Sequence, residues 1–273
     1  IVMLTDENRI IKSILLGSQI AVEGVPLNNN IIIEGENQIT VIKEPGPEQI
    51  RTVGEQDTAV ILVNFQDDPT NQPFTPSFIN DYVSNSQQSV HQYYREVSYE
   101  QTFFIGNVFG WYTIPYNSQC DTWEIVNLAL EAANNDITYP EYRHIVIMFP
   151  TINCGWAGNS YGSFLVNTPD GPVWLSIELI NGLYPAVHHE LGHGLGALHA
   201  SSFICQNSPL YAPYFYFEES GLCSVSEYGD AFDVMGGAFL KMHLNGAHKD
   251  HFHWFTSSQI REISSSGIYT LYP

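Results

Sequence analysis

The sequence reads HELGHGLGALH from His189 to His199, and this stretch decides how the second half of the chain must fold. It matches the pattern H-E-x-x-H-x-x-G-x-x-H at every fixed position, which is a specific signal. On an α-helix His189 and His193 lie four residues apart on one face, so both imidazoles can bind one metal ion. Gly196 can adopt the left-handed backbone that ends a helix, and the turn returns His199 as a third ligand. The stretch therefore predicts a zinc site with one open position, as in catalytic rather than structural zinc sites.

Glu190 follows the first of these histidines directly. It therefore lies about 100° around the helix from His189 and flanks the metal without having to bind it. A carboxylate in this place can take a proton from a metal-activated water and pass it to a leaving amine. We therefore predict that Glu190 is the general base in the hydrolysis of an amide bond.

The remaining histidines form no comparable pattern. His188 lies outside the spacing and is predicted to be a bystander. A second group near the end of the sequence is either another metal-binding patch or a polar helix face. Its members are His243, His248, His251 and His253.

The chain has two regions with different patterns of apolar and turn residues. Residues 1–54 contain four short β-type runs, at 10–16, 19–25, 30–34 and 38–42, separated by Gly, Pro and Asn turn residues. This pattern predicts a small all-β domain, followed by a linker at residues 44–48. Residues 55–273 alternate buried strands with helices, which predicts an α+β domain with a mixed sheet. The predicted strands are 58–65, 103–114, 143–149, 163–167 and 173–180, and the predicted helices are 76–97 and 120–134.

Charge and hydropathy exclude two classes of partner. Nine Lys and Arg against 29 Asp and Glu give a formal net charge of −20, and such a surface repels nucleic acid. No apolar run approaches the roughly 20 residues of a membrane span. The acidity indicates solubility, calcium binding or a preference for basic substrates. Calcium would have the loop residues Asp67, Asp68 and Asp170 available, although no calcium-loop motif is present.

The chain has four cysteines, Cys120, Cys154, Cys205 and Cys223. Their wide spacing argues against a cysteine-rich zinc knuckle. Four cysteines permit three disulfide connectivities, and four separate buried thiols are the alternative. Two disulfides formed in an oxidising compartment are the favoured interpretation, which predicts a secreted protein.

At the histidine motif and beyond it, the chain resembles the metzincin clan of zinc peptidases, and within that clan the gametolysin family. Residues 228–236, YGDAFDVMG, resemble the methionine turn that lies beneath the metal, with Met235 as its methionine. Similar segments are VILVNF at 60–65, YREVSY at 94–99, FGWYTI at 109–114 and CGW at 154–156. The resemblance covers residues 58–272. It implies a metzincin-like domain with a twisted sheet and a zinc-dependent endopeptidase activity on extracellular proteins.

The resemblance has two further implications. An extended polypeptide substrate would add to an antiparallel edge strand between Ser163 and Asn167, by β-augmentation. The pairings Cys120–Cys154 and Cys205–Cys223 are favoured, the second closing the loop before the methionine turn.

The chain also departs from some metzincins. Those enzymes have a tyrosine just after the methionine turn that stabilises the transition state, whereas here two glycines and Ala238 follow Met235. Tyr228 is a candidate for that role by proximity in sequence alone. No cysteine lies in residues 1–54, so this segment has no thiol to block the zinc.

Two alternatives to an active endopeptidase are open. In a latent or purely binding form, residues 1–54 would cover the cleft, and an acidic residue such as Asp6 would reach the zinc. A zinc amidohydrolase that cleaves a non-protein amide would use the same short motif.

Overall fold

The computed structural model describes residues 51–205, 223–237 and 242–270, together with strand backbones at 19–22, 25–27, 30–32 and 39–43. None of the helices in these ranges is long and apolar enough to cross a membrane.

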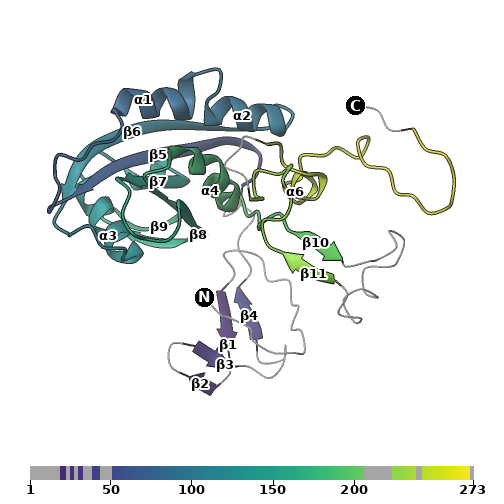
Figure 1. Cartoon of the computed structure of the whole chain (residues 1–273), viewed down its shortest axis with the longest axis horizontal. Coiled ribbons are helices and arrows are strands. Elements are labelled where there is room, and N and C mark those ends of the chain that lie inside the picture. The colour runs from purple at the N-terminus through teal and green to yellow at the C-terminus, as the bar shows by residue number, and fades with distance from the viewer. Residues whose placement is uncertain are drawn as a thin grey trace.

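A five-stranded sheet is the largest sheet of the described residues, with helices around it (Figure 1). Its strands are β5 (Gly54–Phe65), β6 (Thr102–Ile114), β7 (His144–Phe149), β8 (Gly158–Thr168) and β9 (Gly171–Asn181). They lie in the order β6-β5-β7-β9-β8, and only β8 runs antiparallel to its neighbour. The predicted mixed sheet is confirmed. The strand that contains Ser163 and Asn167 lies at the edge of this sheet.

Two apolar cores cover the two faces of the sheet. Strand β7 is buried at all its positions because it lies in the middle of the sheet and is covered from both sides. On one face the core is shared by α2 (Val90–Val97) and α4 (Val187–Gly194). On the other face it is shared by α3 (Thr122–Ala132) and the short helix η3 (Tyr139–Glu141). The helix predicted at 120–134 is confirmed as α3, which begins after Asp121, whose side chain accepts a hydrogen bond from the Glu124 amide.

The single helix predicted for residues 76–97 is wrong. The segment forms α1 (Pro76–Asn80), a π-helical turn η2 (Asp81–Asn85) and, after a break, α2. Ser86 is extended, and Ser89 caps α2 by accepting a hydrogen bond from the Gln92 amide. The apolar spacing alone did not reveal the break, because buried positions continue on both sides of it.

In the amino-terminal region, β1 (Gln19–Val22) pairs with β4 (Ile39–Lys43), and β2 (Val25–Leu27) pairs with β3 (Asn30–Ile32). Pro26, predicted to separate strands, lies within β2. The predicted strand at 10–16 lies outside the described residues, as does Asp6. The boundary near residue 54 stays a prediction. Thr52 already packs with the larger region, because its carbonyl accepts a hydrogen bond from Trp254 Nε1 at 2.8 Å.

Cys120 and Cys154 form the predicted disulfide, with Cα atoms 5.2 Å apart. The short strands β10 (Ser202–Cys205) and β11 (Cys223–Ser226) form a separate antiparallel pair. Their register places Cys205 opposite Cys223. The side chains of these two cysteines lie outside the described residues, so the second disulfide stays a prediction.

Candidate metal centre and cleft

Helix α4 carries the first two histidines of the motif. It ends just before Gly196, as the sequence predicted. Gly194 is its last helical residue, Leu195 is the C-cap, and Gly196 follows with a left-handed φ of 99°. The amide of Gly196 bonds to the His193 carbonyl at 2.8 Å, and that of Ala197 to the Gly192 carbonyl at 3.0 Å. This pair of bonds is a Schellman ending, which satisfies carbonyls that a helix end leaves open. The chain then reverses and brings His199 back toward the helix.

The three histidines converge. One ring nitrogen from each of His189, His193 and His199 lies within 4.8 Å of the other two. In the ranges that the structure describes, they are the only group of three or more His, Cys, Asp or Glu side chains that could share a metal ion.

The hydrogen bonds of the rings fix which nitrogen faces the centre. His189 Nδ1 lies 2.8 Å from the Val234 carbonyl and His193 Nδ1 lies 2.7 Å from the Ala197 carbonyl. Because a carbonyl oxygen only accepts, both Nδ1 atoms carry the proton and both Nε2 atoms present a lone pair. His199 Nδ1 lies 2.6 Å from a carboxylate oxygen of Glu227, which orients that ring in the same way. Such outer partners are typical of metal-binding histidines.

This donor set fits zinc. The Nε2 atoms of His189 and His193 are 3.1 Å apart, and neither has a proton to share in the neutral rings. Two ligands about 2.0–2.1 Å from a tetrahedral ion would be roughly 3.3 Å apart. Burial lowers the pKa of His189 and lowers that of His193 to about 4, so both rings are neutral at pH 7, as metal ligands must be.

Glu190 lies beside the histidines with only 5% of its surface exposed. Gly158, at the start of β8, approaches it so closely that a Cβ atom there would lie 2.3 Å from Glu190 Oε1. Burial, and then the nearby Glu178 carboxylate, raise the pKa of Glu190 to about 8. A dication bound at the histidines would lower it again, because it favours the charged form. The carboxyl group is therefore placed in a weakly solvated position where it can exchange a proton.

Met235, the candidate methionine of the turn, packs against the helix. It is fully buried, and a Cβ atom on Gly192 of α4 would lie 2.4 Å from its sulfur. The turn is held by Asp233, which accepts hydrogen bonds from the Met235 amide at 2.7 Å, the Asn245 amide at 2.7 Å and His248 Nδ1 at 2.8 Å. The same turn presents the Val234 carbonyl to His189, so it positions a ligand.

Tyr228 covers the histidines from the solvent side. Its ring centroid lies 3.8 Å from that of His199 and 6.0 Å from that of His189. It has a left-handed φ of 60°, a conformation that tyrosine rarely adopts and that is often found at functional sites. A hydrogen bond of 2.7 Å from the Gly237 amide to its carbonyl helps to hold it there. Burial, and then the carboxylates of Glu227 and Glu190, raise the pKa of Tyr228, so the hydroxyl remains a hydrogen-bond donor.

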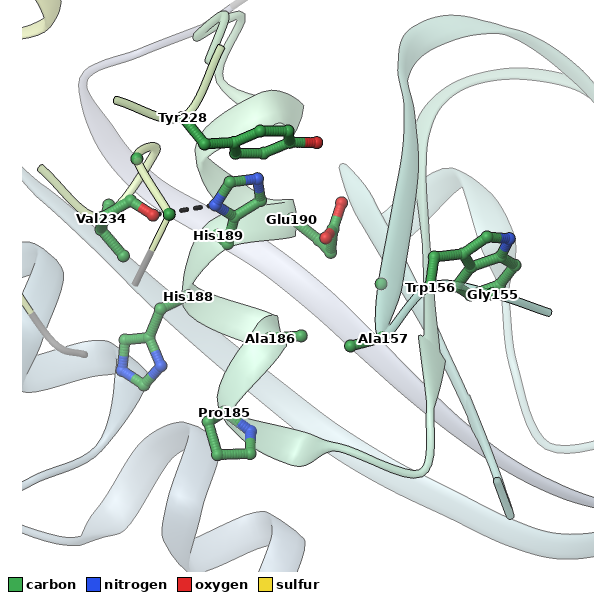
Figure 2. A pocket seen from close by; sticks show the side chains of 13 residues that line it. Gly155, Trp156, Ala157, Pro185, Ala186, His188, His189, Glu190, Tyr228 and Val234 are labelled. Carbon is green, nitrogen blue, oxygen red and sulfur yellow. Dashed lines mark hydrogen bonds between the residues drawn. The ribbon is translucent and has the colours of Figure 1, made fainter. Parts of the chain in front are cut away.

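Two cavities meet at this centre. The larger, of about 420 Å³, has a mainly apolar lining that includes Trp156, Ala157, Pro185, Ala186 and Val234. The second, of about 330 Å³, follows the start of β8 from Gly158 to Gly162 and reaches His193 and His199. Gly158, His189, Glu190 and Tyr228 line both. Figure 2 shows Glu190 pointing from α4 toward Ala157 and Trp156, with the Tyr228 ring above His189.

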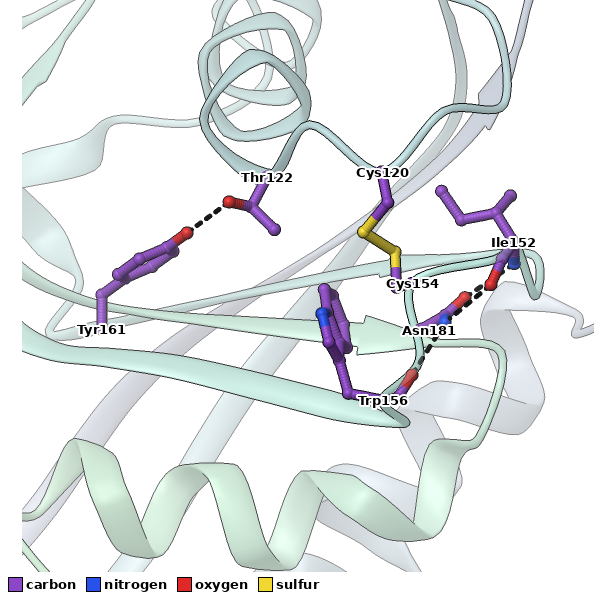
Figure 3. The surroundings of a disulfide bond; sticks show 7 residues. All are labelled: Cys120, Thr122, Ile152, Cys154, Trp156, Tyr161 and Asn181. Carbon is purple, nitrogen blue, oxygen red and sulfur yellow. Dashed lines mark hydrogen bonds between the residues drawn. A yellow bond between two sulfur atoms is a disulfide. The ribbon is translucent and has the colours of Figure 1, made fainter. Parts of the chain in front are cut away.

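Opposite α4, the wall of the larger cavity is held by a disulfide and by the hydrogen bonds of one asparagine side chain (Figure 3). The Cys120–Cys154 disulfide joins the loop that follows β7 to the residue before the Asp121 cap of α3. From the other side, the Asn181 side chain accepts a hydrogen bond from the Ile152 amide and donates to the carbonyls of Ile152 and Trp156. The loop that carries Trp156 is therefore anchored at both ends.

Several other sequence predictions can now be placed. His188 is no part of the histidine centre. It is buried in the lining of the larger cavity, 2.9 Å from the Tyr82 hydroxyl. The histidines between His243 and His253 form no group that could share a metal ion within the described ranges; His243 pairs with Glu96 at 3.1 Å and His248 with Asp233. His248 and His251 instead lie on the short helix α6 (Gly246–His251).

The acidic residues considered for calcium do not converge. Asp67 follows the carboxyl end of β5, whereas Asp170 precedes the amino end of β9; because these strands run parallel, the two residues lie at opposite strand ends of the sheet. Asp67 accepts hydrogen bonds from Ser118, and Asp170 accepts one from the Tyr139 amide at 2.8 Å. Calcium binding stays a prediction without a located site.

The sequence interpretation missed Glu227, Glu178 and Asn181, because no motif or spacing marks them. Only the adjacency of Glu227 to Tyr228 could have drawn attention to one of them. Comparison with known proteins found no protein-family model and no curated protein that matches this chain. The functional argument therefore rests on the site itself.

Proposed function

We propose that this chain is a zinc-dependent endopeptidase of the metzincin type, resembling the gametolysin family. The observation that carries the proposal is the convergence of the three histidines with their outer partners. Two unprotonated Nε2 atoms 3.1 Å apart direct their lone pairs at each other, and a cation between them would be stabilised by both. His189, His193 and His199 would hold the zinc, which supplies Lewis-acid polarisation and lowers the pKa of water at the site.

Glu190 accepts a proton from the attacking water and delivers it to the leaving amine, as its place beside His189 allows. Its burial at 5% exposure keeps bulk water from competing for that proton. The Tyr228 hydroxyl, which lines the same two cavities as Glu190, donates a hydrogen bond to the oxygen that gains negative charge in the transition state. Nothing in these roles requires the backbone to move far, because both residues already line the same two cavities.

A polypeptide is the substrate that the surroundings favour. Strand β8 is an antiparallel edge strand, to which an extended peptide can add, and the cavities lie in sequence along residues 155–162. A small non-protein amide would use neither the edge strand nor two cavities. The Cys120–Cys154 disulfide supports action in an oxidising, extracellular setting.

The test is casein hydrolysis by the purified chain, by Glu190→Ala and by a chelator-treated sample, with the zinc content of each measured. We expect about one zinc per chain, cleavage by the wild type, and no cleavage after chelation. Glu190→Ala should keep the metal and lose activity. Zinc binding without cleavage, even after removal of residues 1–54, would instead favour the amidohydrolase or binding alternatives.

A further inference from the structure

Strand β8 carries an irregularity next to the cleft. Its pairing with β9 is regular up to Ser160 opposite Glu178 and resumes at Ser163 opposite Ser176. Three steps along β8 thus match two along β9, so one extra residue is accommodated at Tyr161 and Gly162, a β-bulge. Gly162 has a left-handed φ of 63°, which a glycine adopts without strain.

The bulge changes which side chains share a face. In a regular strand, residues three apart point to opposite faces, but one inserted residue brings Tyr161 and Phe164 to the same face. There both rings meet Trp123 of α3. Tyr161 stacks on Trp123 with centroids 4.4 Å apart, and Phe164 approaches Trp123 edge-on at 5.6 Å. The Tyr161 hydroxyl donates to the hydroxyl of Thr122, which fixes its ring. We call these three rings the aromatic ledge.

The ledge is accessible and continuous with the cleft. Trp123 is 44% exposed although it stacks on Tyr161. Tyr161 also lines the smaller cavity, together with His199 and Glu190. The neighbouring charges, Asp121 and Glu124 at the start of α3, are carboxylates, and the whole chain carries a net charge of −20. An acidic side chain is therefore disfavoured on this surface, whereas a flat apolar ring can stack on it.

The position of the ledge along a bound peptide follows from the strand. Gly158 lies against Glu190, and the ledge begins three residues later at Tyr161 and ends at Phe164. After the bulge is discounted, these distances correspond to about three to five residues of an extended chain. A peptide that adds antiparallel to β8 runs from the end of that strand toward its start, where Gly158 and Glu190 lie. The substrate residues beside the ledge therefore come before the scissile bond in the peptide.

We infer that the aromatic ledge of Trp123, Tyr161 and Phe164 is a specificity subsite that binds an aromatic side chain about three to five residues before the scissile bond. This inference rests on the proposed function and names a feature of its substrates. The ledge discriminates between substrates without touching the reacting atoms.

The test uses three peptides with the same central residues: a short one, one extended by five residues on the amino side with a Phe, and one extended equally on the carboxyl side. Binding is measured by anisotropy on the zinc-loaded Glu190→Ala background, and cleavage on the otherwise wild-type chain. We expect the amino-side Phe peptide to bind about 3- to 10-fold more tightly than the short peptide. Trp123→Ala should bring this ratio close to one, and Trp123→Phe, which keeps a ring, should restore most of it.

An equal gain from the carboxyl-side extension, or a gain that survives in Trp123→Ala, would overturn the inference. The inference would also be overturned if replacing Phe by Glu in the amino-side extension left its gain in binding unchanged. Failure of the proposed function is seen separately, as absence of cleavage of all three peptides, because the binding ratio does not depend on turnover.

Discussion

Asn181 is the residue whose replacement tests most directly how the cleft wall is held. The residue is 5% exposed, and its side chain makes three hydrogen bonds to the loop: with the Ile152 amide at 2.8 Å, the Ile152 carbonyl at 3.0 Å and the Trp156 carbonyl at 2.8 Å. Asn181→Ala removes all three. At about 0.5–1.5 kcal/mol for each bond, the free energy of unfolding should fall by roughly 1.5–4.5 kcal/mol.

The assay is urea unfolding with the disulfide intact, compared at equal m values. Asn181→Asp should lose at least as much stability, because its second oxygen would face two carbonyl oxygens in place of a donor. Asn107→Ala is the matched control. Its side chain makes an exposed bond of 3.3 Å to Tyr142, so its effect should stay within about 0.5 kcal/mol.

The loop also forms one wall of the larger cavity, so activity gives a second readout. Asn181→Ala should raise KM more than it lowers kcat, because Trp156 and Ala157 line the cavity without reaching the reacting atoms. An Asn181→Ala chain as stable as the wild type, within about 0.5 kcal/mol, would refute the view that this side chain holds the loop.

Two further predictions concern groups around the histidines. Glu227→Ala removes the carboxylate 2.6 Å from His199 Nδ1 and should weaken zinc affinity about 10- to 100-fold in a competition with a chelator, whereas Glu124→Ala on α3 should leave it unchanged. Equal affinities in the two variants would contradict the orienting role of Glu227. Tyr228→Phe keeps the ring over His199 but removes the donor, so kcat should fall about 10²-fold while KM and zinc content hold. A KM effect alone would mean that Tyr228 binds substrate but does not stabilise the transition state.

Local features of the sequence were enough to predict much of the framework. Continuous apolar runs predicted the buried central strands, since a strand covered on both faces has no polar side to show. The spacing of His189 and His193 and the glycine at 196 predicted a helix, its end and the return of His199. Each of these depends on residues close together in the sequence, where helical periodicity and backbone sterics act directly.

The tertiary structure alone decided how distant segments complete the site. Glu227 reaches His199 across 28 positions, and Asn181 holds a loop 25 to 29 residues before it. The bulge that turns Tyr161 toward Trp123 arises from the pairing of β8 with β9; Gly162 permits it, but only the pairing locates it. The sequence by itself therefore determined which residues can bind a metal and move a proton. The residues that orient the histidines, hold the cleft loop and form the aromatic ledge depend on contacts between distant segments. Packing, and not local spacing, decides which segments meet.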